Sequence, residues 1–171
     1  TVIRAVCKAR SLGASDLHLL LVGDGMSRED LARLVDELGA GDCVTFYGSV
    51  PAKDIPRFTA LADALIVSLS DSPDLGLTVP AKVASYMAAG KPVIASMDGA
   101  GFEAIRTAGC GPACPACDVD ALADSLVRLY RASPEERARL GANARAYYLA
   151  HYRRSILLKR LETFILDGTV G

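Results

Sequence analysis

Short, mainly apolar runs alternate with helical apolar spacings over the first two-thirds of the chain. Short apolar runs bounded by turn-forming residues are typical of buried strands. They predict strands at 17–22, 43–47, 64–69 and 92–96, with a weaker strand-like segment around Cys110. Because these runs lack polar alternation, we expect helices to cover both faces of the sheet.

Apolar residues at helical spacing predict the helices between these strands. We expect helices at the N-terminus, with Val2, Ile3, Val6 and Leu12 on one face, then over 27–38, 55–62, from about Val79 to Gly90, and over 102–108. Ser27 with Asp30 resembles a capping box, in which two side chains bind backbone N–H groups at a helix start.

Helices dominate the predicted structure after Cys110. Asp118 is the expected cap of a helix whose apolar face is Leu122, Leu126 and Leu129. Ser133-Pro134-Glu135-Glu136 starts another helix, with Ser as the cap and Pro at the first helical position. A final helix follows Arg153-Arg154 and uses Ile156, Leu157, Leu161, Phe164 and Ile165.

This order of elements predicts an α/β fold, a doubly wound parallel sheet (Rossmann-like) with additional C-terminal helices. No strand precedes the first helix, so we expect residues 1–171 to be one domain of a longer protein, lacking its first strand. Between the strands at 64–69 and 92–96 lies a polar loop, in the place where open parallel sheets bind ligands. The helix that starts there favours an anion.

The composition narrows the class of function. The 171 residues are 51% hydrophobic and 23% charged, which excludes a disordered chain. With a net charge of -1 and no Trp, we expect no nucleic-acid partner. No apolar run approaches the roughly 18 residues that span a bilayer. Five cysteines, an odd number, favour a reducing compartment, and we expect a cytoplasmic protein.

Gly23-Asp24-Gly25 follows a predicted strand and precedes a predicted helix. Such a turn brings backbone N–H groups close to a ligand, which makes Gly23 and Gly25 candidate binding residues. The third glycine of the dinucleotide fingerprint is absent, and a tight turn requires glycine in any case. A purely conformational role is therefore the alternative.

Cys110, Cys114 and Cys117 have the spacing of cluster-binding cysteines in radical enzymes that use S-adenosylmethionine. Those motifs follow an early strand of a much larger barrel, and a zinc site would need a fourth ligand. The two histidines, His18 and His151, lie far away in the sequence. We therefore predict no metal and interpret the cysteines as small residues that fill a loop.

Residues 63–79 imitate the phosphoacceptor segment of response-regulator receivers, with Asp71 as the acceptor. A receiver also needs an acidic pair after an earlier strand and a lysine at the end of a later one. Asp24 is a single acid, and Lys91 precedes its strand. The residues therefore favour another function.

The segments LHLLLVGDGMSREDL, CVTFYGSVP, ADALIVSLS, VASYMAAGKPVIAS with DGAGFEAI, DVDALADSLVRLY and RLGANARAYYLAHY follow one another over nearly the whole chain. In this order they resemble the C-terminal, nucleotide-sugar-binding half of GT-B fold glycosyltransferases of the retaining family 4 group. TVPAK before YMAAGKP resembles a subgroup that builds bacterial surface polysaccharides, often from UDP-linked amino or deoxy sugars.

The resemblance implies roles for the residues at matching positions. The base would pack near Gly48, Ser49 and Val50. Backbone N–H groups of Gly76, Leu77, Thr78 and Val79 would meet the diphosphate and the sugar. Lys82 would add a positive charge toward a phosphate, with a solvated surface lysine as the alternative.

The sequence departs from the family at two positions. Many members carry two Glu residues separated by seven positions, of which the first touches the donor sugar and the second holds the ribose hydroxyls. The matching positions here are Leu77 and Ser85. Ser85 would make one ribose hydrogen bond in place of a charged bidentate acceptor. The family's basic pair that clamps the diphosphate would lie before Thr1.

The resemblance implies a donor domain that binds a nucleotide diphosphate sugar, UDP-linked, without a cofactor or metal. Transfer would be retaining, to a polysaccharide, lipid or other acceptor. The acceptor-binding half would be N-terminal to this chain, and any contact with the inner face of the membrane would be made through it. Catalytic residues stay unassigned. A non-hydrolysing sugar-nucleotide epimerase and a degenerate, non-catalytic binding domain remain open alternatives.

Overall fold

The computed structural model describes residues 1–167, with the side chains of residues 73 and 75 outside that description. The end of the predicted domain, 168–171, lies outside the described residues. The strands are β1 (Leu19–Val22), β2 (Val44–Gly48), β3 (Leu65–Ser68), β4 (Val93–Ser96) and β5 (Ala113–Cys114). The helices are α1 (Val2–Ser11), α2 (Arg28–Glu37), η1 (Ala52–Asp54), α3 (Ile55–Leu61), α4 (Pro73–Gly76), α5 (Ala81–Ala89), α6 (Ala100–Ala108), α7 (Val119–Arg131), α8 (Pro134–His151) and α9 (Arg154–Asp167).

The strands pair in parallel, which confirms the predicted α/β class, but they form two sets. β1 pairs with β2, and β3, β4 and β5 form a three-stranded sheet in that order. In the second set Leu65 lies opposite Val93, and Ala95 lies opposite Ala113. The carboxyl ends of β3 and β4 therefore lie side by side, and this brings together the loops that follow them.

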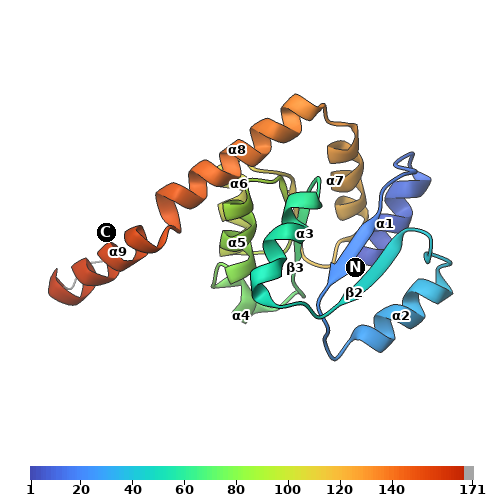
Figure 1. The fold of residues 1–171 in the computed structure, drawn as a ribbon, viewed down its shortest axis with the longest axis horizontal. Coiled ribbons are helices and arrows are strands. Elements are labelled where there is room, and N and C mark those ends of the chain that lie inside the picture. Colours follow the sequence, from blue (N-terminus) through green and yellow to red (C-terminus); the bar gives the residue numbers. More distant parts are fainter. Residues whose placement is uncertain (168–171) are drawn as a thin grey trace.

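One hydrophobic cluster joins the two strand sets. It contains Leu19 and Val44 from the first set and Ile94 and Cys114 from the second, together with α1 and α7. Helices α1 and α7 pack against each other, as Figure 1 shows. The apolar face predicted for α7 is confirmed, because its leucines 122, 126 and 129 are all buried. A shared core of this kind makes the two sets parts of one domain.

Helix α8 holds the C-terminal ends of two neighbouring helices. Arg145 Nη1 donates a hydrogen bond of 2.7 Å to the carbonyl oxygen of Ala88, at the end of α5. Asn143 Nδ2 donates one of 2.9 Å to the carbonyl oxygen of Gly109, just past α6. The last carbonyls of a helix lack partners within it and carry partial negative charge. These two contacts therefore fix the positions of α5 and α6.

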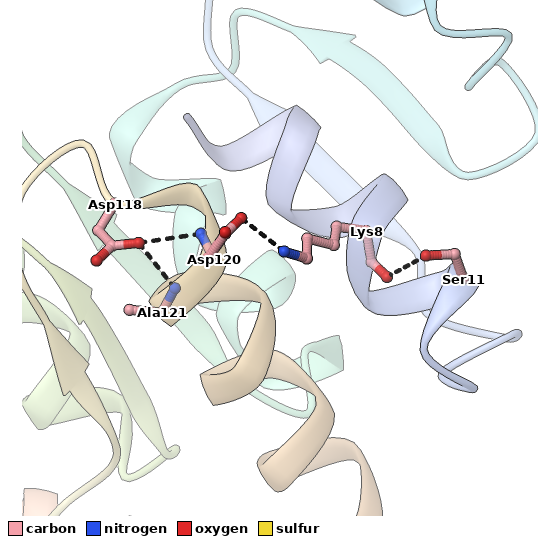
Figure 2. A network of polar contacts seen from close by, with 5 residues as sticks. All are labelled: Lys8, Ser11, Asp118, Asp120 and Ala121. Carbon is pink, nitrogen blue, oxygen red and sulfur yellow. Dashed lines mark hydrogen bonds and ion pairs between the residues drawn. The ribbon is translucent and has the colours of Figure 1, made fainter.

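Side-chain caps form at two of the three predicted helix starts. Asp118 Oδ1 accepts hydrogen bonds from the backbone N–H groups of Asp120 (3.0 Å) and Ala121 (2.9 Å), and Asp120 also pairs with Lys8 of α1 (Figure 2). Ser133 accepts from the N–H of Glu136 at 3.1 Å. Both caps were predicted and are confirmed.

The capping box predicted at Ser27 and Asp30 is wrong. Ser27 makes no side-chain cap hydrogen bond, and Asp30 pairs with Arg33 instead. A capping residue normally has extended backbone dihedrals, which direct its oxygen at the N–H groups of the first turn. Ser27 has φ -89° and ψ 5°, close to a turn conformation, so its hydroxyl points elsewhere.

The prediction that helices cover both sheet faces is wrong for β1 and β2. Leu20 lies opposite Thr45 on one face, and Leu20 is 41% exposed. Tyr47 is 57% exposed, and its ring packs on that of Phe58 of α3 with 4.6 Å between ring centroids. The described helices thus leave this face largely open, although its residues are partly apolar.

The final helix is confirmed, but most of its predicted apolar face is exposed, with Ile156 half-buried. Leu161 is 53% exposed and Ile165 is 70% exposed. Figure 1 shows α9 beyond the end of α8, away from the sheets. Within residues 1–167, no helix combines the length and apolar character needed to cross a membrane.

Candidate functional site

The candidate residues lie at or after the carboxyl ends of the parallel strands: Gly48 ends β2, Gly76 ends the short α4, Lys82 and Ser85 lie on α5, and the others lie in the loops. The structure brings Gly23 and Gly48 together, since the N–H of Gly23 donates to the carbonyl oxygen of Gly48 at 2.8 Å. Both glycines have positive φ values, +130° and +86°, which explains why glycine is required there. A Cβ on either would meet nothing within 4 Å, so the space beside this turn is open.

Three other candidates line the same end of the first strand set. Gly25 has no positive φ, and a Cβ there would also meet nothing within 4 Å. Ser49 is exposed and Val50 is half-buried. The structure therefore leaves the residues expected to face a base accessible, and it joins Gly23 to Gly48 as one turn.

The helix predicted from about Val79 is present and begins at Ala81, two residues later. Pro80 explains the difference: proline disfavours the helical conformation in the residue before it, and it has no N–H group. Gly76 is instead the last residue of the short α4. Leu77, Thr78 and Val79 form the connection to α5, and Leu77 is 81% exposed.

Lys82 and Ser85 lie one turn apart on α5. Lys82 is exposed in the first turn, and no ion pair engages it among residues 1–167. Ser85 Oγ donates a hydrogen bond of 3.0 Å to the carbonyl oxygen of Ala81. The hydroxyl proton of Ser85 is therefore used within the helix, and its oxygen remains free to accept a hydrogen bond.

A small cavity lies between the loops after β3 and β4. It is lined by Leu69, Ser70, Ser72, Gly76 and Asp98, and its volume is about 10 Å³. That is close to the smallest space that holds one water molecule. Sequence reasoning missed Asp98, because its nearness to Gly76 depends on the pairing of β3 with β4.

Gly99, the residue after Asp98, packs against Gly76. It has φ +73°, and a Cβ there would overlap the carbonyl oxygen and the Cα of Gly76. The backbones of residues 76 and 99 are thus in direct contact. No polar contact joins 48–50 to 76–85 within the described part of the chain, so the two candidate groups stay separate.

The cysteine triplet is divided between core and surface. Cys110 and Cys114 are buried and Cys117 is exposed. Burial raises the pKa of the Cys110 thiol to about 11, so this thiol is protonated at neutral pH. Cys114 Sγ donates to the carbonyl oxygen of Ala95 at 3.3 Å. Within residues 1–167, His, Cys, Asp and Glu side chains form no group of three suited to hold a metal.

The two histidines have ordinary surface surroundings. His18 Nε2 lies 2.8 Å from Thr45 Oγ1 across the β1–β2 pair. The ring of His151 packs on Tyr147, with 4.2 Å between centroids. Neither contact includes a carboxylate that would orient the imidazole as a catalytic base.

These features define a doubly wound α/β domain with ligand-accessible loops at its strand ends, and comparison with known proteins identifies its family. The model of "Glycosyl transferases group 1" matches residues 1–132. The chain belongs to this glycosyltransferase family, and its fold is that of the GT-B glycosyltransferases.

Two curated relatives are enzymes. The chain is 29% identical over 155 residues to the GDP-mannose-dependent alpha-(1-6)-phosphatidylinositol monomannoside mannosyltransferase of Mycolicibacterium smegmatis, covering 89% of this chain and 40% of the relative. It is 28% identical over 152 residues to the N-acetyl-alpha-D-glucosaminyl L-malate synthase of Bacillus anthracis, covering 89% and 38%. The chain thus spans about two-fifths of the length of these relatives.

Solved structures share the fold. S. aureus TarM, in a complex with UDP, superimposes with a TM-score of 0.79 at 16% identity, covering 95% of this chain and 32% of TarM. Anabaena HepE in complex with UDP gives 0.77 at 22% identity, covering 94% and 44%. Sucrose-phosphate synthase of Thermosynechococcus elongatus gives 0.75 at 26% identity, covering 98% and 43%.

Proposed function

We propose that this chain is the donor-binding domain of a glycosyltransferase and that it binds a nucleotide diphosphate sugar, UDP-linked. The main support for this proposal is that the exposed first turn of α5, which contains Lys82, lies at the end of the loop that follows β3. Free N–H groups and a lysine at one place suit a diphosphate. The family match and the UDP-bound structures of similar fold support the same ligand.

The remaining candidates fit the other parts of the donor. The open turn at Gly23, Gly48 and Val50 has room for a flat base, because added Cβ atoms at its glycines meet nothing within 4 Å. Ser85 lies one turn after Lys82 on α5, and in our proposal its oxygen accepts one hydrogen bond from a ribose hydroxyl. No metal takes part.

We propose a retaining transfer in which the protein stabilises the departing nucleoside diphosphate. Backbone N–H groups at 77–79 and the Lys82 ammonium neutralise the charge that develops on the leaving phosphate, whereas the N–H of Gly76 already donates to the carbonyl oxygen of Ser72 at 3.3 Å. Such donors act best when they are already in place before the reaction, because no reorganisation is then needed. Contacts from α8 to Ala88 and Gly109 hold α5 and α6 in position.

We propose further that a longer protein supplies one strand between β1 and β3. Among the described residues β1 pairs only with β2, and β3 pairs only with β4. The doubly wound order 3-2-1-4-5-6 corresponds to β2–β1–strand–β3–β4–β5 with one strand added. Amide hydrogen exchange on the full-length protein tests this. If a strand lies between β1 and β3, the backbone N–H groups on both sides of each of these two strands should exchange slowly.

An acceptor-binding half in the longer protein accounts for the open apolar face of α9. Leu161, Phe164 and Ile165 are each at least half exposed in this domain. We propose that the acceptor half is N-terminal to this chain and lies in the cytoplasm, with any contact to the inner membrane face made there. The M. smegmatis relative acts on a phosphatidylinositol mannoside, so a lipid-linked acceptor is a reasonable first substrate to assay.

The competing function is a nucleotide-sugar-binding domain without catalysis. Leu77 points into solvent, and the hydroxyl proton of Ser85 is already bonded to Ala81, so neither position offers a carboxylate. An assay of the full-length protein with UDP-glucose, UDP-N-acetylglucosamine and GDP-mannose separates the two. We expect nucleotide release on addition of acceptor, with retention of the anomeric configuration by NMR. Binding without turnover would favour the non-catalytic domain.

A further inference from the structure

The carboxylate-bearing residue Asp98 lines the small cavity between the loops that follow β3 and β4. Asp98 lies two residues after the end of β4, and the backbone pairing of Leu69 with Ser96 brings the start of the loop after β3 alongside the end of β4. Asp98 lines the same cavity as Ser70, Ser72 and Gly76. Residues that follow two different strands, β3 and β4, thus line one cavity, and among the described residues Asp98 is its only carboxylate-bearing lining residue.

One oxygen of this carboxylate is used for structure. Asp98 Oδ2 accepts a hydrogen bond of 3.3 Å from the backbone N–H of Ala116, in the loop before α7. No other polar contact or ion pair engages Asp98 within the described residues, and the residue is exposed. Its second oxygen is therefore available to accept a hydrogen bond from a ligand.

The surrounding backbone holds Asp98 in place. Gly99, the next residue, packs directly against Gly76, and the conformation of Gly99 at φ +73° leaves no room for a Cβ. A Cβ on Gly101 would lie 3.1 Å from Pro80 Cδ, so the start of α6 also packs tightly on the loop before α5. Asp98 is consequently fixed relative to the loop that carries Gly76.

The chemistry of the cavity selects one part of a nucleotide sugar. A carboxylate accepts hydrogen bonds and repels phosphate, whereas the hydroxyl groups of a sugar are donors. A volume of about 10 Å³ matches a single water-sized oxygen rather than a whole ring. We propose that Asp98 binds one hydroxyl group of the donor sugar and that this oxygen occupies the cavity. The proposal rests on the function proposed above and adds a sugar-recognition residue to it.

The test compares nucleotide and nucleotide sugar on the full-length protein and its Asp98→Asn variant. Asparagine keeps the shape of the side chain and an oxygen that accepts from Ala116, so the fold is preserved. Calorimetry with the pairs UDP and UDP-glucose, and GDP and GDP-mannose, measures the sugar contribution. We expect nucleotide affinity to stay within about two-fold and nucleotide-sugar affinity to fall roughly ten-fold, because a charge-assisted hydrogen bond becomes a neutral one.

Two controls make the result specific to Asp98. Asp71→Asn changes an exposed acid in the loop after β3 that does not line the cavity, and it should leave all affinities unchanged. Deoxy derivatives of the sugar donor, each lacking one hydroxyl, identify the group bound. The donor that lacks this hydroxyl should bind the wild-type protein more weakly and should lose nothing further with Asp98→Asn.

The outcomes are distinct. Equal weakening of nucleotide and nucleotide sugar by Asp98→Asn would make Asp98 a purely structural residue and overturn the proposal. Unchanged affinity for both would overturn it too. If wild-type protein bound none of these nucleotides or nucleotide sugars, the proposed donor function itself would fail.

Discussion

Glycine serves different purposes at the carboxyl ends of the two strand sets. At the end of β1 and β2, Gly23 and Gly48 need positive φ values, and the space beside them is open. At the end of β3 and β4, Gly99 also has a positive φ, but its missing Cβ leaves room for the backbone of Gly76. We infer that the open end receives the large, flat part of a ligand and that the closed end makes backbone contacts to small groups.

The largest effect is expected from Gly99→Ala, at the closed end. The new methyl group overlaps Gly76, and the backbone conformation at residue 99 is strained for any side chain. We expect the free energy of unfolding to fall by about 3 kcal/mol, measured by urea denaturation. Gly41→Ala is the control, since residue 41 has neither a close neighbour nor a positive φ. Equal stability of the two variants would remove the distinction between closed and open ends.

A smaller effect is expected from Gly48→Ala, at the open end. The methyl group meets nothing within 4 Å, so only the left-handed backbone at φ +86° is strained. The cost is about 1 kcal/mol in unfolding free energy. Gly25→Ala, with no positive φ, should cost less than half of that. A loss at residue 48 as large as that at residue 99 would show that the turn is packed and that the open end is not open.

The two strand sets also differ in how the helices that follow them begin. In the second set, after β5, α7 begins with Asp118 bonded to two N–H groups, whereas α2, after β1, begins without a side-chain cap. We expect Asp118→Ala to lower the unfolding free energy by about 1 kcal/mol. Ser27→Ala should change it by no more than a few tenths, as thermal unfolding of both variants can check. A clear loss at Ser27 would indicate a cap that the structure lacks.

Local patterns predicted much of the fold because their causes are local. The four apolar runs became strands within two residues of their predicted ends, whereas the strand expected around Cys110 lies at Ala113–Cys114. Asp118 and Ser133 cap helices as expected, since a cap depends on the next three residues. The start of α5 was misplaced because Pro80 outweighed the apolar spacing from Val79. The exposure of Leu20 and of the apolar residues of α9 was not predicted. A periodic pattern shows which residues share a face, but it does not show whether another element packs against that face.

The candidate site was predictable in outline for the same reason. Glycine turns and a helix start after apolar strands indicate where a ligand binds in this fold class. Asp98 was missed, because its relation to Gly76 arises from the pairing of strands more than 25 positions apart. The hydrogen bond from the Ser85 hydroxyl to the carbonyl oxygen of Ala81 was likewise not predicted, because it depends on the side-chain rotamer within the helix.

The most direct test of the donor site is calorimetry of UDP and GDP binding to the full-length protein and its Lys82→Ala variant. Lys159→Ala, on the exposed surface of α9, is the matched control. We predict that a nucleoside diphosphate binds the wild-type protein, that Lys82→Ala weakens it roughly three- to ten-fold through loss of one phosphate contact, and that Lys159→Ala has no effect. Equal affinities for all three proteins would contradict the assignment of the diphosphate to the start of α5.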